Sequence, residues 1–319
     1  MTNKKMILDL DTGVDDALAL AYAVAEPSID LIGIISSYGN TLVDTSGQNS
    51  LDLLHLLKQE DVPVFIGESH SSTTDSFETM QISKDIHGNN GIGEVELEKA
   101  IRPIETQSGV DFLIEAAHQY GEDLIFLPTG PLTNLAAAIK KDPEVANLIG
   151  NTTLMGGALT VEGNVTPYAE ANINQDPQAA DTVFKKQKNL TMIGLDVTLR
   201  TLLTKNETGQ WRKLGVVGEK FADITDFYID AYYNLGIDKK GCALHDPLAV
   251  GVSVDSSFVS LIDLNMKVMS DETYWGRTIG DKDRLLEATT TKVAVDVDHQ
   301  RYLEYFMKLL NELFEQVAN

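Results

Sequence analysis

Cysteine is nearly absent from this chain, because Cys242 is the only one among its 319 residues. A single cysteine cannot form a disulfide within the chain, and such sparing use is typical of proteins that stay in a reducing compartment. We therefore expect a cytoplasmic protein. The chain is long enough for a large hydrophobic core, which would stabilise the fold without covalent cross-links.

Positive charge is also scarce. The chain carries 25 Lys and Arg residues against 48 Asp and Glu, which gives a formal net charge of −23. The phosphate backbone of a nucleic acid would repel such a chain, so we expect no nucleic-acid partner. The acidity by itself needs no explanation beyond solubility.

Long hydrophobic runs are missing as well. No apolar stretch approaches the about 20 residues that a membrane-spanning helix needs. The apolar run after the basic N-terminus is broken by Asp9, too early for a signal peptide. We therefore expect neither a membrane span nor a secretory signal.

Short apolar runs and helix-like runs alternate along the chain. The expected strands are residues 6–8, 31–36, 62–66, 124–127, 152–155 and 190–193, and the expected helices are 16–25, 45–57, 110–117, 132–140, 177–185, 221–233 and 301–317. Apolar strands that alternate with helices predict an α/β fold, with a mostly parallel central sheet flanked by helices. No linker interrupts the pattern, so residues 1–319 are expected to form a single domain.

Two segments are expected outside this regular structure. Residues 69–80 are polar and rich in Ser and Thr, which is typical of an exposed loop. Residues 87–93 contain several glycines and are expected to be mobile. Together with residues 221–243, they would close over a bound ligand.

Four aspartates crowd the end of the first expected strand: Asp9, Asp11, Asp15 and Asp16. Ligands of parallel sheets bind at the carboxyl ends of the strands, and crowded carboxylates are costly unless a cation neutralises them. Oxygen ligands without a Cys/His cluster favour Ca²⁺ or Mg²⁺ over zinc. Asp15 could instead cap the following helix, but four aspartates in eight residues favour the cation.

Further polar residues follow later in the chain. Asn164, Glu170 and Asn172 offer donors and acceptors suited to sugar hydroxyls, whereas Asp176 reads as the cap of a helix that begins at Pro177. His245 could act as a general acid or base beside the candidate ligand Asp246, although a structural role is equally compatible with one histidine.

Several of these segments together resemble the inosine–uridine-type nucleoside hydrolases. The first is Asp9-Leu10-Asp11-Thr12-Gly13-Val14-Asp15-Asp16-Ala17. The others follow in the family's order: Ser37-Tyr38-Gly39-Asn40, Asp85-Ile86-His87-Gly88, Thr129-Gly130-Pro131-Leu132-Thr133-Asn134, Gly163-Asn164 through Asp176-Pro177, and His245-Asp246-Pro247. Each motif is modest alone, but the set spans nearly the whole chain and is specific.

The resemblance implies hydrolysis of the N-glycosidic bond of ribonucleosides, with a tightly bound Ca²⁺ and a homodimer or homotetramer. It implies calcium ligands at Asp11, Asp16, Asp246 and the backbone carbonyl of Thr129. The residues that it implies for holding the ribose are Asp15, Asn40, Asn164, Glu170 and Asn172. Asp11 would also be the base that activates water.

The leaving nucleobase must be stabilised when the bond breaks. His245 is the best candidate acid. Tyr228, Tyr232 or Tyr233 could stack on the base or relay a proton, and His87 would contact the substrate from its expected loop.

The chain departs from the family pattern at two positions. Thr12 stands where many relatives have proline, which should change only the rigidity of the turn. Ala171 stands where several relatives have an aromatic residue, which removes a packing surface at the sugar.

Two rival interpretations share part of the pattern. A haloacid-dehalogenase-like phosphatase also opens with a strand that ends in Asp-x-Asp, but it would leave His245 and Asp246 without a role. A nucleoside-binding or calcium-dependent sensor would have no need of Asp11 as a base.

Overall fold

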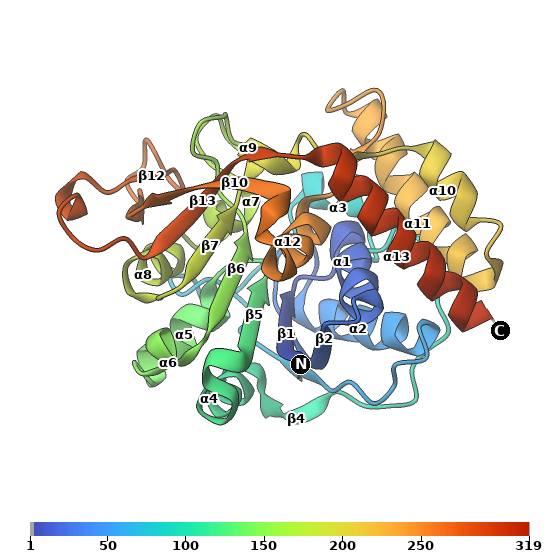
Figure 1. Ribbon diagram of the computed structural model, residues 1–319, viewed down its shortest axis with the longest axis horizontal. Coiled ribbons are helices and arrows are strands. Elements are labelled where there is room, and N and C mark those ends of the chain that lie inside the picture. Colours follow the sequence, from blue (N-terminus) through green and yellow to red (C-terminus); the bar gives the residue numbers. More distant parts are fainter. Residues whose placement is uncertain (1–2, 319) are drawn as a thin grey trace.

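A nine-stranded sheet runs through the centre of the computed structural model, which describes residues 3–318 (Figure 1). Its strand order is β10-β13-β7-β6-β5-β1-β2-β3-β4. The strands are β1 (Lys4–Leu10), β2 (Ile29–Ser36), β3 (Val64–Ile66), β4 (Glu105–Ser108), β5 (Leu124–Pro128), β6 (Asn151–Met155), β7 (Leu190–Ile193), β10 (Val259–Leu264) and β13 (Thr291–Val297). All neighbours pair in parallel except β10 with β13. The expected α/β fold with a mostly parallel sheet is confirmed.

Helices cover both faces of this sheet (Figure 1). They are α1 (Val14–Ala25), α2 (Val43–Leu56), α3 (Gln81–His87), α4 (Gly109–Tyr120), α5 (Thr133–Lys141), α6 (Val145–Leu148), α7 (Ala171–Gln175), α8 (Pro177–Lys186), α9 (Leu195–Thr198), α10 (Lys205–Trp211), α11 (Gly215–Asn234), α12 (His245–Val254) and α13 (His299–Ala318). Two small ribbons add β8 (Leu202–Leu203) with β9 (Cys242–Ala243), and β11 (Met266–Val268) with β12 (Thr278–Gly280). None of the helices in residues 3–318 is long and apolar enough to cross a membrane.

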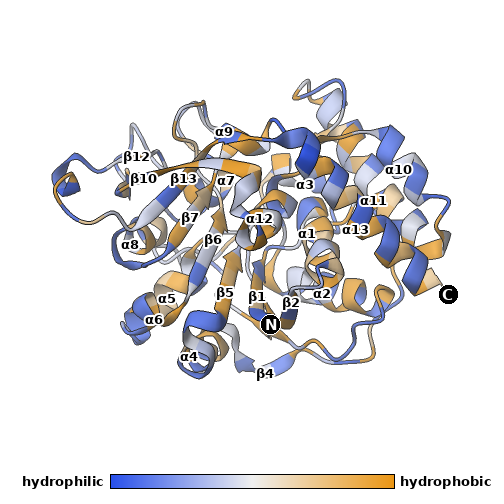
Figure 2. Cartoon of the chain, in the orientation of Figure 1, coloured by the Kyte–Doolittle hydropathy of each residue, from blue (hydrophilic) through white to orange (hydrophobic). Residues whose placement is uncertain are grey.

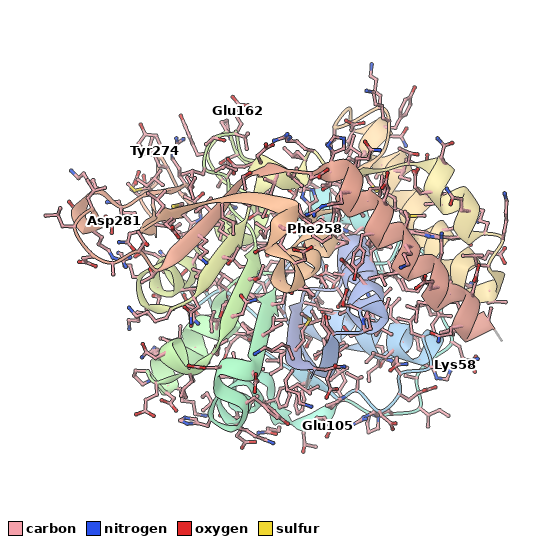
Figure 3. All side chains as sticks on the ribbon, in the orientation of Figure 1. Lys58, Glu105, Glu162, Phe258, Tyr274 and Asp281 are labelled. Atoms are coloured by element: carbon pink, nitrogen blue, oxygen red, sulfur yellow. The ribbon has the colours of Figure 1, made fainter. Side chains whose placement is uncertain are left out.

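Strand β1 shows how the sequence builds two hydrophobic cores. Successive side chains of a strand point to opposite faces. Met6 and Leu8 accordingly join the core beneath α1, α12 and α13, while Ile7 joins the core beneath α4, α5 and α8. The apolar residues of these elements gather inside the molecule (Figure 2). Polar side chains such as Lys58 and Glu162 project from the periphery, and Phe258 packs inside (Figure 3).

Every expected strand and helix is present, with boundaries that differ by a few residues. Residues 69–80 form no helix or strand, as expected for a loop. The apolar patterns did not reveal β4, β10 or β13.

One structural expectation was wrong. His87 does not lie in a mobile loop, because it is the buried last residue of α3, and most of residues 221–243 belong to helix α11. Hydrogen bonds within each helix and packing of α3 against α11 hold both segments.

Candidate active site

The acidic residues meet where β1 ends and α1 begins. Asp9 belongs to β1, Asp11 follows it, and Asp15 and Asp16 lie in the first turn of α1, where the helix dipole favours negative charge. The backbone N–H of Gly13 donates to Asp16 Oδ2 at 2.7 Å. Gly39 makes room for this cluster, because its φ of +154° disfavours other residues and a Cβ there would lie 2.0 Å from Asp11 Oδ2.

Three carboxylates form the tightest group. Asp15, Asp16 and Asp246, from the first turns of α1 and α12, offer ligand atoms that all lie within 4.8 Å of one another, and all three are buried. This group contains two of the expected ligands, Asp16 and Asp246, together with Asp15. Segments at opposite ends of the chain therefore converge on one acidic site.

Asp11 lies beside this group and keeps one oxygen free. Its Oδ2 accepts the backbone N–H of Asn40 at 2.6 Å. Its Oδ1, like Asp15 Oδ1, is buried and has no hydrogen-bond partner among residues 3–318. Buried acceptors without partners are costly, so both oxygens are suited to receive a cation or a ligand proton.

The raised pKa values of these carboxyl groups also favour a bound cation. Burial, and then repulsion by Asp16, raises the pKa of Asp15 to about 8. Burial likewise raises the pKa of Asp11, Asp16 and Asp246. Without a countercharge, burial favours the protonated form of each of these groups. Ligand atoms that are all oxygen fit a hard divalent cation, which would displace the protons from these carboxylates.

Thr129 joins the site from β5, the parallel neighbour of β1. Its hydroxyl donates to Asp16 Oδ1 at 2.7 Å. Its carbonyl oxygen accepts Asn172 Nδ2 at 2.6 Å and has a second lone pair. The expected carbonyl ligand therefore lies next to the acidic cluster.

The other expected sugar-binding residues line the same cavity. Asn40 Nδ2 lies 3.4 Å from Asp16 Oδ2. Glu170 caps α7, because its carboxylate accepts the N–H groups of Asn172, Ile173 and Gly157. Asn164 Oδ1 accepts the N–H of Ala171 at 3.0 Å. These bonds hold the polar side chains rigidly at one side of the cavity.

The cavity has a volume of about 470 Å³ and a lining of more than one chemical kind. Carboxylates and amides form one part of this lining. Apolar side chains form another part, namely Met80, Ile82, Ile86, Val165, Leu199, Leu235 and Ile237. A ligand with a polar hydroxylated half and a flat apolar half matches this division.

Two histidines and two tyrosines also line the cavity. His87 stacks on Tyr228 at 5.2 Å between ring centroids, and His87 Nδ1 accepts the N–H of Val14 at 3.1 Å. His245 Nε2 lies 2.9 Å from the hydroxyl of Tyr232. Burial lowers the pKa of His87 to about 3 and that of His245 to about 4, so both rings are uncharged at neutral pH until a negative charge approaches.

The tyrosines are only partly those expected. Tyr232 and Tyr228 are buried and line the cavity, whereas Tyr233 is 61% exposed and is not among the lining residues. Successive residues of a helix point in different directions, so α11 can turn only one of Tyr232 and Tyr233 inward. Sequence reasoning left open which tyrosine faces the cavity.

Asp9 and Asp176 support the site from outside the cavity. Asp9 accepts Asn134 Nδ2 at 2.9 Å. Asp176 caps α8 through the N–H of Ala179, as expected, and also accepts hydrogen bonds from Ser72 and Thr133. Both carboxylates join neighbouring loops at the same edge of the sheet.

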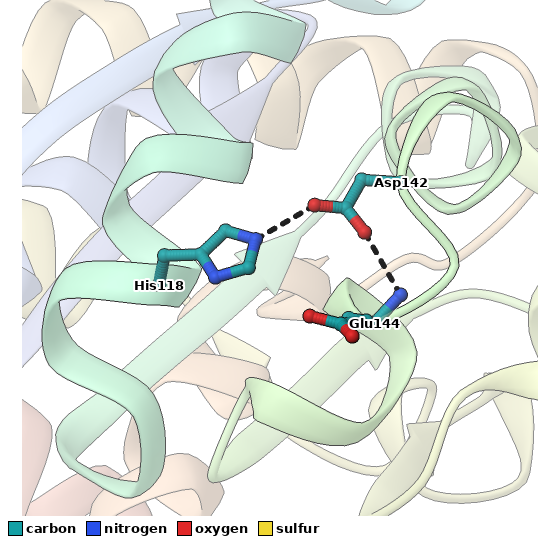
Figure 4. A group of neighbouring side chains, drawn as sticks. All are labelled: His118, Asp142 and Glu144. Carbon is teal, nitrogen blue, oxygen red and sulfur yellow. Dashed lines mark hydrogen bonds and ion pairs between the residues drawn. The ribbon is translucent and has the colours of Figure 1, made fainter.

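A second group that could hold a metal lies on the surface. It consists of His118, Asp142 and Glu144 (Figure 4). His118 Nε2 and Asp142 Oδ2 lie 2.7 Å apart, and Asp142 Oδ1 accepts the N–H of Glu144. The Asp142 oxygens are therefore already partnered, and the group is explained as an exposed ion pair beside a helix start.

Comparisons with known proteins identify the family of the chain. The family model described as "Inosine-uridine preferring nucleoside hydrolase" matches residues 6–304. "Probable uridine nucleosidase 2" of Arabidopsis thaliana is 33% identical over 97% of this chain and 98% of its own. "Pyrimidine-specific ribonucleoside hydrolase RihB" of Escherichia coli (strain SE11) is 32% identical over 98% of this chain and 97% of its own.

A solved structure is more similar still. The "Purine-Preferring Ribonucleoside Hydrolase from Gardnerella vaginalis" superposes with a TM-score of 0.96 at 51% identity, over 98% of this chain and 100% of that chain.

Proposed function

This chain belongs to the inosine-uridine preferring nucleoside hydrolase family and is a nucleoside hydrolase, and from that premise we propose how it cleaves ribonucleosides. The proposal is that water attacks the anomeric carbon of a ribonucleoside bound over a calcium ion. The C–N bond breaks, the base leaves with the bonding electrons, and ribose and free base result. The observation that carries it is the buried acidic cluster at a cavity whose lining combines polar and apolar side chains.

Asp11, Asp16, Asp246 and the carbonyl of Thr129 would hold the Ca²⁺. Asp15 lies close enough to Asp16 and Asp246 to serve the same ion, and we assign it to the ribose that would bind above. When bound, a divalent cation supplies positive charge that lowers the pKa of the attacking water. The unpartnered oxygens of Asp11 and Asp15 support this assignment.

Asp11 is the base in this proposal. Its Oδ2 is fixed by the Asn40 N–H, while its Oδ1 is free to take a proton from water. The oxocarbenium-like transition state carries positive charge on the sugar, and the surrounding carboxylates stabilise it. A cluster that is costly in the resting protein is therefore favourable at the transition state.

Hydrogen bonds would hold the ribose from several directions. Asp15, Asn40, Asn164, Glu170 and Asn172 line the polar part of the cavity. Bonds to the backbone fix Asn164, Glu170 and Asn172 before the substrate arrives, so little conformational entropy is lost on binding.

The base would lie among the aliphatic side chains with Tyr232 and His87 nearby. His245 would supply the proton for the leaving nitrogen of the base, directly or through Tyr232. The negative charge that develops on the leaving base would raise the pKa of the His245 imidazole. Many of the lining side chains are apolar, so shape would govern base preference. The identity of 51% to a purine-preferring hydrolase favours purines over pyrimidines.

The proposal includes the setting in which the enzyme works. We infer a single-domain protein that acts in the cytoplasm as a homodimer or homotetramer, in nucleoside salvage. The single cysteine supports a reducing compartment, and the net charge of −23 supports the absence of a nucleic-acid partner.

Product analysis tests the function. The calcium-loaded protein is incubated with inosine, adenosine, uridine and cytidine, and both ribose and free base are quantified. Equal amounts of the two products, with faster release from the purine nucleosides, are expected. Release of phosphate from p-nitrophenyl phosphate without any base release would instead indicate a phosphatase. Binding of nucleosides without products would indicate a sensor.

A further inference from the structure

A chain of buried hydrogen bonds links Asp15 to Thr198. The hydroxyl of Tyr228 lies 3.4 Å from Asp15 Oδ2 and 3.2 Å from the hydroxyl of Tyr232. Tyr232 lies 2.9 Å from His245 Nε2, and His245 Nδ1 lies 2.8 Å from Thr198 Oγ1. All five side chains are buried, so water does not replace these bonds.

The chain has one consistent direction. When a bound cation keeps Asp15 ionised, its carboxylate can only accept, so Tyr228 donates its single proton to it. Tyr228 must then accept from Tyr232, because neither hydroxyl has a second proton. Tyr232 must in turn accept from His245, which places a proton on His245 Nε2.

The hydrogen bond of the other ring nitrogen, Nδ1, is made with Thr198. When the ring is neutral, Nδ1 carries a lone pair that accepts the proton of the Thr198 hydroxyl. When the ring is cationic, the Nδ1–H donates to the same hydroxyl oxygen. A hydroxyl is able to do both by rotating, whereas an amide or a carboxylate would favour one state.

The backbone holds Thr198 firmly in this position. Its N–H donates to the carbonyl of Gly194, and its own carbonyl accepts the Thr201 hydroxyl at 2.8 Å. Asp196 anchors the same short helix, α9, by accepting the N–H groups of Leu159 and Thr160. Thr198 follows β7 at the edge of the sheet where the acidic cluster lies, so the fold brings it to the histidine.

We propose that Thr198 is a positioning residue for the leaving-group step, fixing His245 with its Nε2 proton directed toward Tyr232 and the base. The inference rests on the proposed function, because it assumes that Asp15 is ionised and that His245 serves the leaving base. Thr198 would touch neither ribose nor base. Its effect should therefore depend on how much help the leaving group needs.

The test compares substrates with two kinds of leaving group. Thr198→Val removes the hydroxyl at nearly constant volume, and Thr198→Ser restores it. His245→Ala gives the full size of the effect. Thr225→Val is the matched control, because Thr225 is also buried and its hydroxyl bonds only to the backbone carbonyl of Phe221. The substrates are inosine and p-nitrophenyl riboside, whose leaving group needs no proton.

Thr198→Val is expected to lower kcat for inosine by about 10- to 100-fold, part of the roughly 10²- to 10⁴-fold that a general acid contributes. KM for inosine and kcat for p-nitrophenyl riboside should change less than about threefold, because neither depends on leaving-group protonation. Thr198→Ser and Thr225→Val should stay close to the wild type. The ¹⁵N resonances of His245 should show protonated Nε2 in the wild type, and the Nδ1 resonance should shift in Thr198→Val because Nδ1 has lost its hydrogen bond.

Equal losses on both substrates, an unchanged kcat for inosine, or no recovery in Thr198→Ser would overturn the positioning role. A wild-type protein that hydrolyses neither substrate would instead overturn the proposed function. In that case the ¹⁵N measurement would still decide whether Thr198 fixes the ring. Thermal unfolding of each variant separates a folding defect from these outcomes.

Discussion

At the residue scale, the sequence identifies the polar residues of the site better than their partners. The crowded aspartates stand out because such clusters are rare without a reason, and the fold brings Asp15 and Asp16 together with Asp246. Thr198 carried no such signal, since a threonine after an apolar strand is unremarkable. The sequence also did not show which side of α11 faces the cavity, because Tyr228, Tyr232 and Tyr233 all fit a helical pattern.

Asp11 provides the sharpest prediction at this scale. Asp11→Ala should abolish ribose release, and Asp11→Asn should lower kcat by roughly 10²- to 10⁴-fold, because both lack a base for the attacking water. The asparagine can still accept the N–H of Asn40, so its fold should be preserved. Ribose release is measured beside circular dichroism, and near-normal turnover of inosine by either folded variant would exclude Asp11 as the base.

At the scale of elements, periodicity predicted the strands and helices that make up most of the two cores. It missed β4, whose sequence Glu105–Ser108 is polar, because an edge strand needs no continuous apolar run. It also assigned His87 to a loop on the strength of the following glycines. Helix α3 instead ends at these glycines, since Gly88 has a φ of +82° that suits a helix terminus.

Asp176 tests how the elements around the site are joined. Asp176→Ala should lower the free energy of unfolding by about 2–3 kcal/mol, because it removes a helix cap and the hydrogen bonds of Asp176 to Ser72 and Thr133. Ser108→Ala is the matched control, since Ser108 caps α4 with a single bond, and about 1 kcal/mol is expected there. Urea unfolding measures both. A loss for Asp176→Ala no larger than that for Ser108→Ala would show that the loop contacts add nothing.

At the scale of the whole molecule, the buried acidic cluster couples stability to cation binding and pH. The pKa of Asp15 is about 8 in the fold, against about 3.9 for an unfolded aspartate. Between these values the folded state holds more protons than the unfolded state, so the metal-free protein loses stability as pH rises from about 4 to about 8. A cation displaces these protons and removes the penalty.

Calcium should therefore raise Tm more near pH 8 than near pH 5, where protons compete for the carboxylates. Differential scanning fluorimetry of chelator-treated protein, with and without Ca²⁺, measures both shifts. Asp246→Asn serves as control, because loss of one ligand should shrink the calcium effect at both pH values. A shift that is equal at the two pH values, or larger near pH 5, would contradict a cation held by these carboxylates.

Ribose release from inosine and uridine, followed through chelation and the return of calcium, tests the central claim most directly. The proposed function predicts stoichiometric ribose and base from the loaded protein, loss of both products on chelation, and recovery with Ca²⁺. Undiminished product release from protein shown to be free of metal would contradict it.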